Sequence, residues 1–212
     1  MAEARRKRAN GEASRERILD AAAEIAGDRG YEGTSINLIS ERSGLPASSI
    51  YWHFRHKDEL IAAVIERSFG QWSAAVSVPV AVPDGTTADE LLRFAMHRTG
   101  AAIAQYPDYL RLGLMLILER RPQEPTARGK FLQVRREAAG RARALYGVVF
   151  PDLDDEAAGA LVTLTMALAD GLFIAREADG LDLAGAFDLL ATAILGAADQ
   201  LRAARGAAAT HR

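Results

Sequence analysis

The stretch SGLPASSIYWHFRHKDEL, residues 43–60, decides how the first part of the chain folds. Pro46 can open a helix, because the backbone N–H that it lacks would be unpaired at the first helical position. At 3.6 residues per turn, Ile50 and Phe54 share one face and can be buried together. The positions that turn away from this face carry Ser48, Ser49, Tyr51, Trp52 and His53. The sequence therefore predicts a short helix over residues 45–54 that exposes aromatic and polar side chains.

Two further helices are expected before this one. The first covers about residues 14–29, with Ser14 as its N-cap and Gly30 as its stop. The second covers about residues 35–42 and ends at Gly44. Two short helices joined by a turn at residues 43–45 match a helix-turn-helix, in which the second helix enters the major groove of DNA.

The rest of the chain also has helical periodicity, apart from a loop at residues 76–87 in which valines alternate briefly between prolines. Helices are expected from about residue 57 to beyond residue 72, and then over about residues 87–105, 107–121, 126–149, 154–178 and 181–205. The predicted fold class is all-α, with about nine helices. We expect an N-terminal arm and helix-turn-helix domain over residues 1–56, a regulatory ligand-binding and dimerisation domain over 57–205, and a disordered tail over 206–212.

Composition limits the classes of protein that remain. The 212 residues are 49% hydrophobic and include no cysteine, which excludes disulfides and thiolate sites. No apolar run is long enough for a membrane span, and no signal-peptide core follows the charged N-terminus. The net charge is −2, yet residues 1–57 carry ten Lys and Arg against eight Asp and Glu. The basic run Arg5-Arg6-Lys7-Arg8 is either a solvated tail or an arm that touches DNA phosphates.

The outward residues of the third helix suit the major groove of DNA. Small Ser48 and Ser49 allow a close approach, and the rings of Tyr51, Trp52 and His53 can pack on sugars while donating to phosphates. Lys57 adds a charge at the start of the next helix. The alternative is a purely structural three-helix subdomain, in which an exposed tryptophan would have no purpose.

Residues 30–60, GYEGTSINLISERSGLPASSIYWHFRHKDEL, resemble the TetR family of bacterial transcriptional repressors. The resemblance is carried by the run from Tyr51 to Phe54, followed by Lys57 and Leu60. Ala47 departs from the family pattern, which often has a Lys or Gln there, although an alanine can still touch a thymine methyl group. The resemblance implies that the following residues face DNA: Ser35, Asn37, Ala47, Ser48, Ser49, Tyr51, Trp52, His53 and Lys57.

The helices that follow carry most of the other large apolar side chains. One interpretation is an effector pocket between helices, as the resemblance implies, and the other is an ordinary helical core. The candidates for pocket lining are Phe69, Trp72, Phe94, His97, Leu110, Met115, Phe131 and Tyr146.

The last two helices are striped with apolar residues at spacings of three and four. Paired across a two-fold axis, two such helices form a four-helix bundle, and the resemblance implies a dimer of this kind. The alternative is that both stripes are buried within one monomer. The candidates for the dimer interface are Leu161, Leu164, Leu168, Leu172, Leu183, Phe187, Leu190 and Ile194.

Together these patterns predict a cytoplasmic, homodimeric repressor that binds double-stranded DNA at a palindromic operator. A small apolar or aromatic effector would release it, and no cofactor, metal ion or membrane is expected. The alternatives are a helical interaction protein that has lost DNA binding and an all-α enzyme. Nothing supports the enzyme, because no Gly-rich phosphate loop or HExxH spacing is present.

Overall fold

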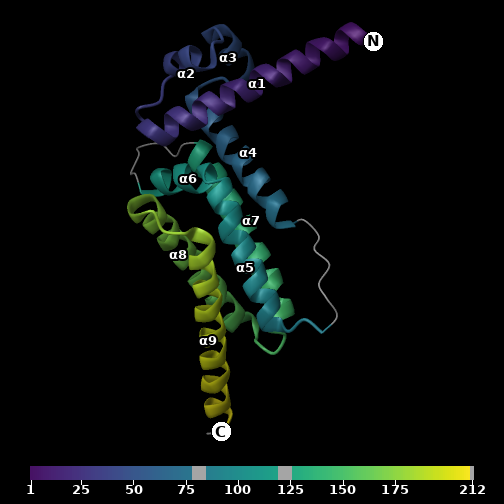
Figure 1. Cartoon of the computed structure of the whole chain (residues 1–212), viewed down its shortest axis with the longest axis vertical. Coiled ribbons are helices and arrows are strands. Elements are labelled where there is room, and N and C mark those ends of the chain that lie inside the picture. Colours follow the sequence, from purple (N-terminus) through teal and green to yellow (C-terminus); the bar gives the residue numbers. More distant parts are fainter. Residues whose placement is uncertain (78–84, 119–125, 211–212) are drawn as a thin grey trace. The chain divides into compact units, whose positions relative to one another are not determined.

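The computed structural model describes the backbone of residues 1–77, 85–118 and 126–210, and the side chains in these ranges except at 2–5, 7–8 and 207–210. The described residues form nine α-helices and no strand, which confirms the all-α prediction. The helices are α1 (Ala2–Arg29), α2 (Ile36–Ser43), α3 (Ala47–His53), α4 (Lys57–Ser77), α5 (Ala88–Gln105), α6 (Asp108–Leu118), α7 (Thr126–Val149), α8 (Asp155–Asp179) and α9 (Leu183–Thr210) (Figure 1).

Local capping explains many of the helix ends. The Ser35 hydroxyl accepts a hydrogen bond from the Leu38 N–H at the start of α2, and Thr87 forms a capping box with Glu90 at the start of α5. Asp154 accepts from the Ala157 N–H and begins α8. Gly180 ends that helix in the left-handed region, with φ of 72°.

Both ends of the chain are more helical than predicted. The prediction of Ser14 as an N-cap is wrong, because α1 begins at Ala2 and the Ser14 hydroxyl donates to the Asn10 carbonyl within the helix. The segment before Ser14 is rich in Ala, Arg and Glu, which are strong helix formers. The predicted tail after residue 205 continues α9 to Thr210. Most of the predicted loop, at residues 78–84, lies outside the described residues, as do residues 119–121 at the predicted end of α6.

The chain divides into two compact units, each described by itself. Unit 1 contains Met1–Gly70 and Pro107–Val134, and unit 2 contains Gln71–Tyr106 and Arg135–Arg212. These units do not divide the chain at the predicted boundary after residue 56, so the assignment of functions to residues 1–56 and 57–205 stays a prediction.

Unit 1 has a core built on α1, α2, α3 and the first part of α4. Its fully buried side chains include Ile18 of α1, Ile39 of α2, Ile50 of α3 and Leu60 of α4. Each comes from the apolar face that helical periodicity predicts, so α3 is fixed against α1 and α2 by its inner side alone.

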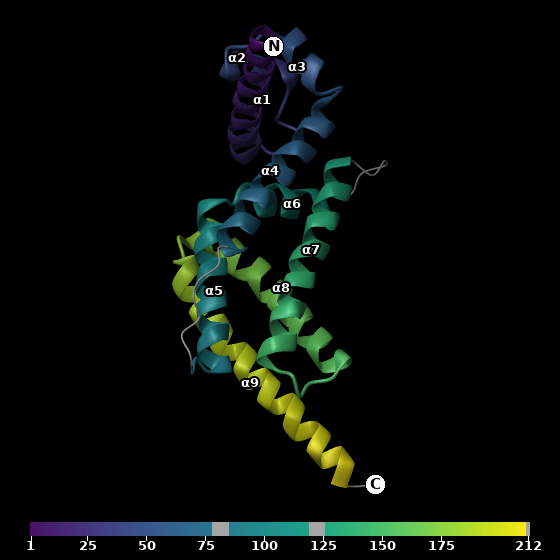
Figure 2. The same ribbon diagram turned by 90° about the vertical axis from the view of Figure 1, so that its right-hand side faces the viewer.

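Unit 2 is organised by the contact between α5 and α9, which run side by side (Figure 2). Gly100 of α5 lies so close to α9 that a Cβ there would be 2.7 Å from the Leu183 carbonyl oxygen and 2.9 Å from Phe187. Tyr146 of α7 is buried and shares a hydrogen bond with Thr165 of α8. The core of unit 2 therefore joins α5, α7, α8 and α9.

Candidate nucleic-acid interface

The turn between α2 and α3 is held by side chains from both sides. Gly44 adopts the left-handed region, with φ of 64°. Arg17 of α1 donates to the Ser43 carbonyl (2.5 Å), and the Ser40 hydroxyl donates to the Leu45 carbonyl (2.7 Å). These bonds fix the direction in which α3 leaves the turn.

The two faces of α3 separate as the sequence predicts. Ile50 is fully buried, and Phe54 directly after the helix is 3% exposed. Trp52 is 77% exposed and Tyr51 is 57% exposed, so neither ring is packed into the core. Large exposed rings at adjacent positions indicate an interaction surface.

The Trp52 ring lies across a hollow between α1 and α3. The hollow has a volume of about 380 Å³, and its lining residues are Asn10, Gly11, Ser14, Ser48, Ser49, Trp52 and His53. Trp52 meets the His53 ring edge to face, with centroids 4.5 Å apart. Four of the α3 residues predicted to face DNA therefore line one hollow, whose other wall is α1.

His53 has a pKa that is lowered from 6.5. Partial burial of the ring is the main cause, and the positive charge of Arg15 is the second. The imidazole is therefore mostly neutral at pH 7, with one nitrogen that donates and one that accepts.

Lys57 has a different position from the one predicted. Its ammonium group donates to the Tyr31 carbonyl (2.8 Å), lies 4.3 Å from the centre of the Tyr31 ring, and is 3.9 Å from the Glu32 carboxylate. The side chain is only 24% exposed. Lys57 thus ties the start of α4 to the turn after α1 instead of extending outward from the helix.

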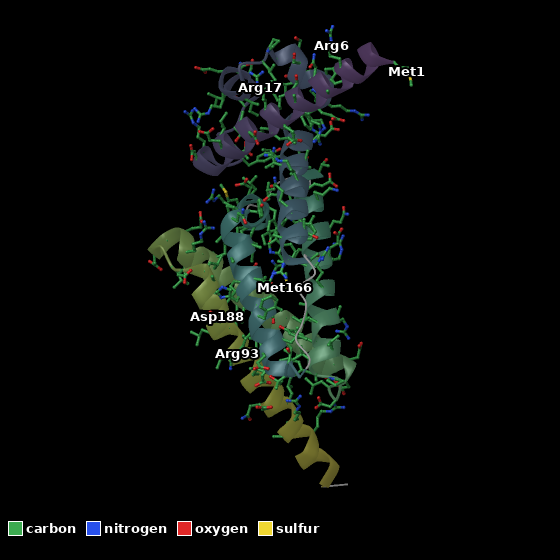
Figure 3. All side chains as sticks on the ribbon, turned by 45° about the vertical axis from the view of Figure 1, so that its right-hand side comes forward. Met1, Arg6, Arg17, Arg93, Met166 and Asp188 are labelled. Carbon is green, nitrogen blue, oxygen red and sulfur yellow. The ribbon has the colours of Figure 1, made fainter. Side chains whose placement is uncertain are left out.

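The remaining predicted contacts lie around the helix-turn-helix. Asn37 is exposed on α2, and Ser35 is exposed at the N-cap of that helix. Ala47 is half-buried at the start of α3. Of the basic run at residues 5–8, the structure describes only the side chain of Arg6, which is exposed on the N-terminal part of α1 (Figure 3). The side chains of Arg5, Lys7 and Arg8 lie outside the description.

Sequence reasoning missed the contribution of α1. Asn10, Gly11 and Ser14 line the hollow, yet they were expected to precede the first helix or to begin it. The composition of residues 2–13 is the signal that could have extended the helix, but no local pattern places it beside α3.

The eight predicted pocket residues fall into both compact units. In unit 1, Phe69 and Phe131 are buried: Phe69 meets the Tyr109 ring, and Phe131 packs on Gly113. Leu110 is buried and Met115 is half-buried in the same unit. These contacts match the alternative of a helical core within unit 1.

In unit 2, Trp72 and Tyr146 are buried, whereas Phe94 and His97 lie on the surface of α5. His97 Nδ1 is 3.1 Å from the Asp188 carboxylate of α9. Phe94 and His97 therefore do not join the buried residues of their unit. The effector pocket stays a prediction.

The predicted interface residues also divide into two groups. Leu164 and Leu168 are each 37% exposed, and Leu172 is half-buried. The other five are buried within a single chain: Leu161, Leu183, Phe187, Leu190 and Ile194. These contacts match the alternative of burial within one monomer, and the dimer interface stays a prediction.

Acidic and histidine side chains are scattered in the described part of the chain. The chain has no cysteine. Among the described residues, no three Asp, Glu or His side chains are close enough together to hold a metal ion.

A helix-turn-helix with an exposed aromatic face, followed by further helices, defines a class of helix-turn-helix regulatory proteins. Residues 18–64 match the family model described as bacterial regulatory proteins, tetR family. This match identifies the N-terminal part of the chain as a tetR-family DNA-binding domain.

Curated relatives match the same N-terminal part. The chain is 36% identical to the HTH-type transcriptional regulator SrpR of Pseudomonas putida over 62 residues, which are 29% of each protein. It is 32% identical to the HTH-type transcriptional regulator AcrR of Shigella flexneri over 65 residues, or 30% of that protein. The chain therefore matches less than a third of the length of these relatives.

Solved structures extend the likeness to most of the fold. A transcriptional regulator from Rhodococcus sp. Rha1 superimposes with a TM-score of 0.65 at 21% identity, covering 86% of this chain and 96% of that one. FadR from Bacillus subtilis, solved in complex with stearoyl-CoA, superimposes with a TM-score of 0.63 at 17% identity, covering 84% and 96%. At these identities the likeness concerns the fold.

Proposed function

We propose that this protein is a ligand-responsive transcriptional regulator, most simply a repressor that a small apolar effector releases from a palindromic operator. Residues 1–56 bind DNA, and residues 57–205 bind the effector and form the dimer. The protein works in the cytoplasm and is not an enzyme. The observation that carries the proposal is the exposed Tyr51–Trp52 pair on α3, held outward by buried Ile50 and Phe54.

The proposed DNA contact uses α3 mainly for phosphates and sugars and α2 for bases. Trp52 and Tyr51 offer flat rings with polar edges, and Ser48 is small enough for a close approach. Asn37 has the amide geometry that pairs with adenine. Ala47 offers only a methyl group, so DNA shape contributes more to the choice of operator than it would with a longer side chain there.

Exposed apolar residues of α8 support a dimer. This helix is long and apolar enough to cross a membrane by length and composition, and only 22% of its most apolar window is buried within the chain. Leu164, Leu168 and Ile174 are between 37% and 52% exposed on it, and Leu189 of α9 is 70% exposed. A second copy that covers these residues would place two α3 helices for a two-fold operator, whose half-sites are about 34–36 Å apart.

Two of the similar solved structures contain small molecules. FadR from Bacillus subtilis was solved with stearoyl-CoA, and the multidrug binding protein EbrR with imidazole. For this chain we propose an apolar or aromatic molecule that binds among the helices of the regulatory domain. It releases DNA only if it binds the DNA-free arrangement more tightly, with a typical coupling of about 1–3 kcal/mol.

DNA binding is tested with a duplex from the chain's own upstream region, by fluorescence anisotropy at several salt concentrations. We expect the unchanged chain to bind with a steep salt dependence and Trp52→Ala to bind at least tenfold more weakly. Val148→Ala, which shortens an exposed apolar side chain on α7, is the matched control and should bind like the unchanged chain. Wild-type affinity for Trp52→Ala would show that α3 is not the reading helix, and no binding at all would favour an interaction protein.

The dimer is tested separately by light scattering after gel filtration. Leu168→Glu and Ile174→Glu should give monomers, whereas Val148→Glu, at a more exposed position on α7, should leave the dimer intact. Dimers in all three variants would move the interface away from α8.

A further inference from the structure

The hollow between α1 and α3 brings together residues that are far apart in the sequence. Asn10, Gly11 and Ser14 form one wall, and Ser48, Ser49, Trp52 and His53 form the other. All seven belong to unit 1, so their arrangement is set within a single compact body. The proposed DNA contacts of this hollow are all on the α3 wall, and none of them is on the α1 wall.

The helix α1 reaches this position because it is longer than a core helix needs to be. The buried residues among its described side chains begin at Ile18, and Figure 1 shows the N-terminal end of α1 extending beyond α3. Asn10, Gly11 and Ser14 of α1 are not buried in the core of unit 1 and line the hollow instead.

Gly11 keeps the space between the two walls open. A Cβ at this position would lie 3.9 Å from two atoms of the Trp52 ring, which is ordinary van der Waals contact. A methyl group would therefore fit, but any longer side chain would extend over the ring and into the hollow. Glycine is otherwise unfavourable in a helix interior, by roughly 0.5–1 kcal/mol relative to alanine.

The chemistry of the lining suits an anion. None of the seven residues is acidic, and Asn10, Ser48 and Ser49 carry side-chain N–H or O–H donors. The Ser14 hydroxyl already donates to the Asn10 carbonyl (2.9 Å), which leaves Asn10 as the main donor on the α1 wall. Arg15, one residue further along α1, lies close enough to His53 to lower the pKa of that ring.

We propose that this hollow holds a backbone phosphate of the operator, with the Asn10 amide donating to it from α1 while Ser48 and Ser49 donate from α3. The inference rests on the proposed function and extends the DNA interface to α1. Trp52 then packs against the sugar next to this phosphate. Since phosphates carry no sequence information, the contact fixes how α3 sits in the groove and does not choose the bases.

Two kinds of variant test this. Asn10→Ala removes the donor without a change of charge, so affinity should fall about tenfold on the operator and on an unrelated duplex alike, with the salt dependence unchanged. Gly11→Leu should fill the hollow and weaken binding at least tenfold, whereas Gly140→Leu, at a glycine of α7 that meets open space, should bind like the unchanged chain. Helical circular dichroism and thermal melting confirm that the three variants are folded.

The outcomes separate the inference from the proposed function. If the unchanged chain binds no DNA with salt dependence, the proposed function fails and the inference with it. If Trp52→Ala weakens binding while Asn10→Ala and Gly11→Leu bind as the unchanged chain does, only the inference is overturned. A loss confined to the operator would also overturn it, because α1 would then be reading bases.

Discussion

The Lys57 ammonium nitrogen lies 2.8 Å from the Tyr31 carbonyl oxygen and 4.3 Å from the centre of the Tyr31 ring. The Tyr31 hydroxyl in turn donates to the Asp58 carboxylate (3.1 Å). The first two residues of α4 therefore bind the turn that leads from α1 to α2. In unit 1, these contacts connect the helix-turn-helix to the helix that follows it.

Removal of the Lys57 charge is expected to destabilise the chain even without DNA. Lys57→Met keeps most of the aliphatic stem but loses a charged hydrogen bond and a cation–π contact, so the free energy of unfolding should fall by about 1–2 kcal/mol. Urea unfolding measures this, and Arg55→Met, a change at an exposed neighbour, is the control. If the two variants are equally stable, the Lys57 contacts do not stabilise the fold, and its role is limited to DNA binding.

Asp58 of α4 also caps α7. Its carboxylate accepts hydrogen bonds from the backbone N–H groups of Thr126 (2.5 Å) and Ala127 (3.3 Å) at the start of α7. Asp58→Ala should therefore cost about 0.5–2 kcal/mol of stability, as the loss of an N-cap does, and Asp58→Asn should cost less because its amide oxygen still accepts. Asp28→Ala, at an exposed carboxylate of α1, is the control in the same thermal unfolding experiment.

The packing of Phe131 on Gly113 predicts a strong effect of one methyl group. A Cβ at Gly113 would overlap the Phe131 ring, so Gly113→Ala should destabilise unit 1 by about 1–3 kcal/mol. Gly140→Ala in α7 meets open space and should stabilise its helix by up to about 1 kcal/mol. If Gly113→Ala melts like the unchanged chain, Phe131 has room to move, as the lining of an effector pocket would.

Burial raises the pKa of Tyr146 to about 12, despite the opposing effect of its hydrogen bond with Thr165. Because the folded pKa exceeds the unfolded value of about 10, the stability that Tyr146 contributes is complete below pH 10 and is lost as the pH rises towards 12. Tyr146→Phe should lack this part of the pH dependence. Unfolding midpoints from pH 8 to 12 for both chains would contradict the assignment if the two curves stay parallel.

The sequence predicts α3 well because the information is local. Periodicity separates Ile50 and Phe54 from Trp52, and the capping residues Ser35 and Gly44 mark the helix before it. The same reasoning does not place the Lys57 side chain, because a charge at a helix start gives no information on a carbonyl 26 residues earlier. Its position depends on how α1 and α4 pack.

The apolar stripe of α9 left two interpretations open for a related reason. Leu183, Phe187 and Ile194 recur as a buried face should, but periodicity does not identify what buries it. Within this chain α5 lies against that face, and the missing side chain of Gly100 allows the close approach. The sequence also does not show which apolar residues of α8 stay exposed. The structure shows that Leu168 is one of them.

The pairing of Asp152 with Arg202 predicts how unit 2 responds to acid. Two hydrogen bonds from the Arg202 guanidinium, at 2.7 and 2.9 Å, lower the pKa of Asp152 to about 2. Since the folded pKa lies below the unfolded value of about 4, the stabilisation is complete above pH 4 and is lost as the pH falls through 2. Asp152→Asn should therefore unfold with a flatter pH dependence between pH 4 and 2 than the unchanged chain.

The Asp152 side chain is 52% exposed, so salt must weaken the effect. At 1 M NaCl, the difference in unfolding midpoint between Asp152→Asn and the unchanged chain should shrink at neutral pH. Asp179→Asn, an exposed carboxylate at the end of α8, is the control and should unfold like the unchanged chain at both salt concentrations. A difference that is the same in low and high salt would show that Asp152 acts through the shape of the turn after α7, and that its charge is not what joins this turn to α9.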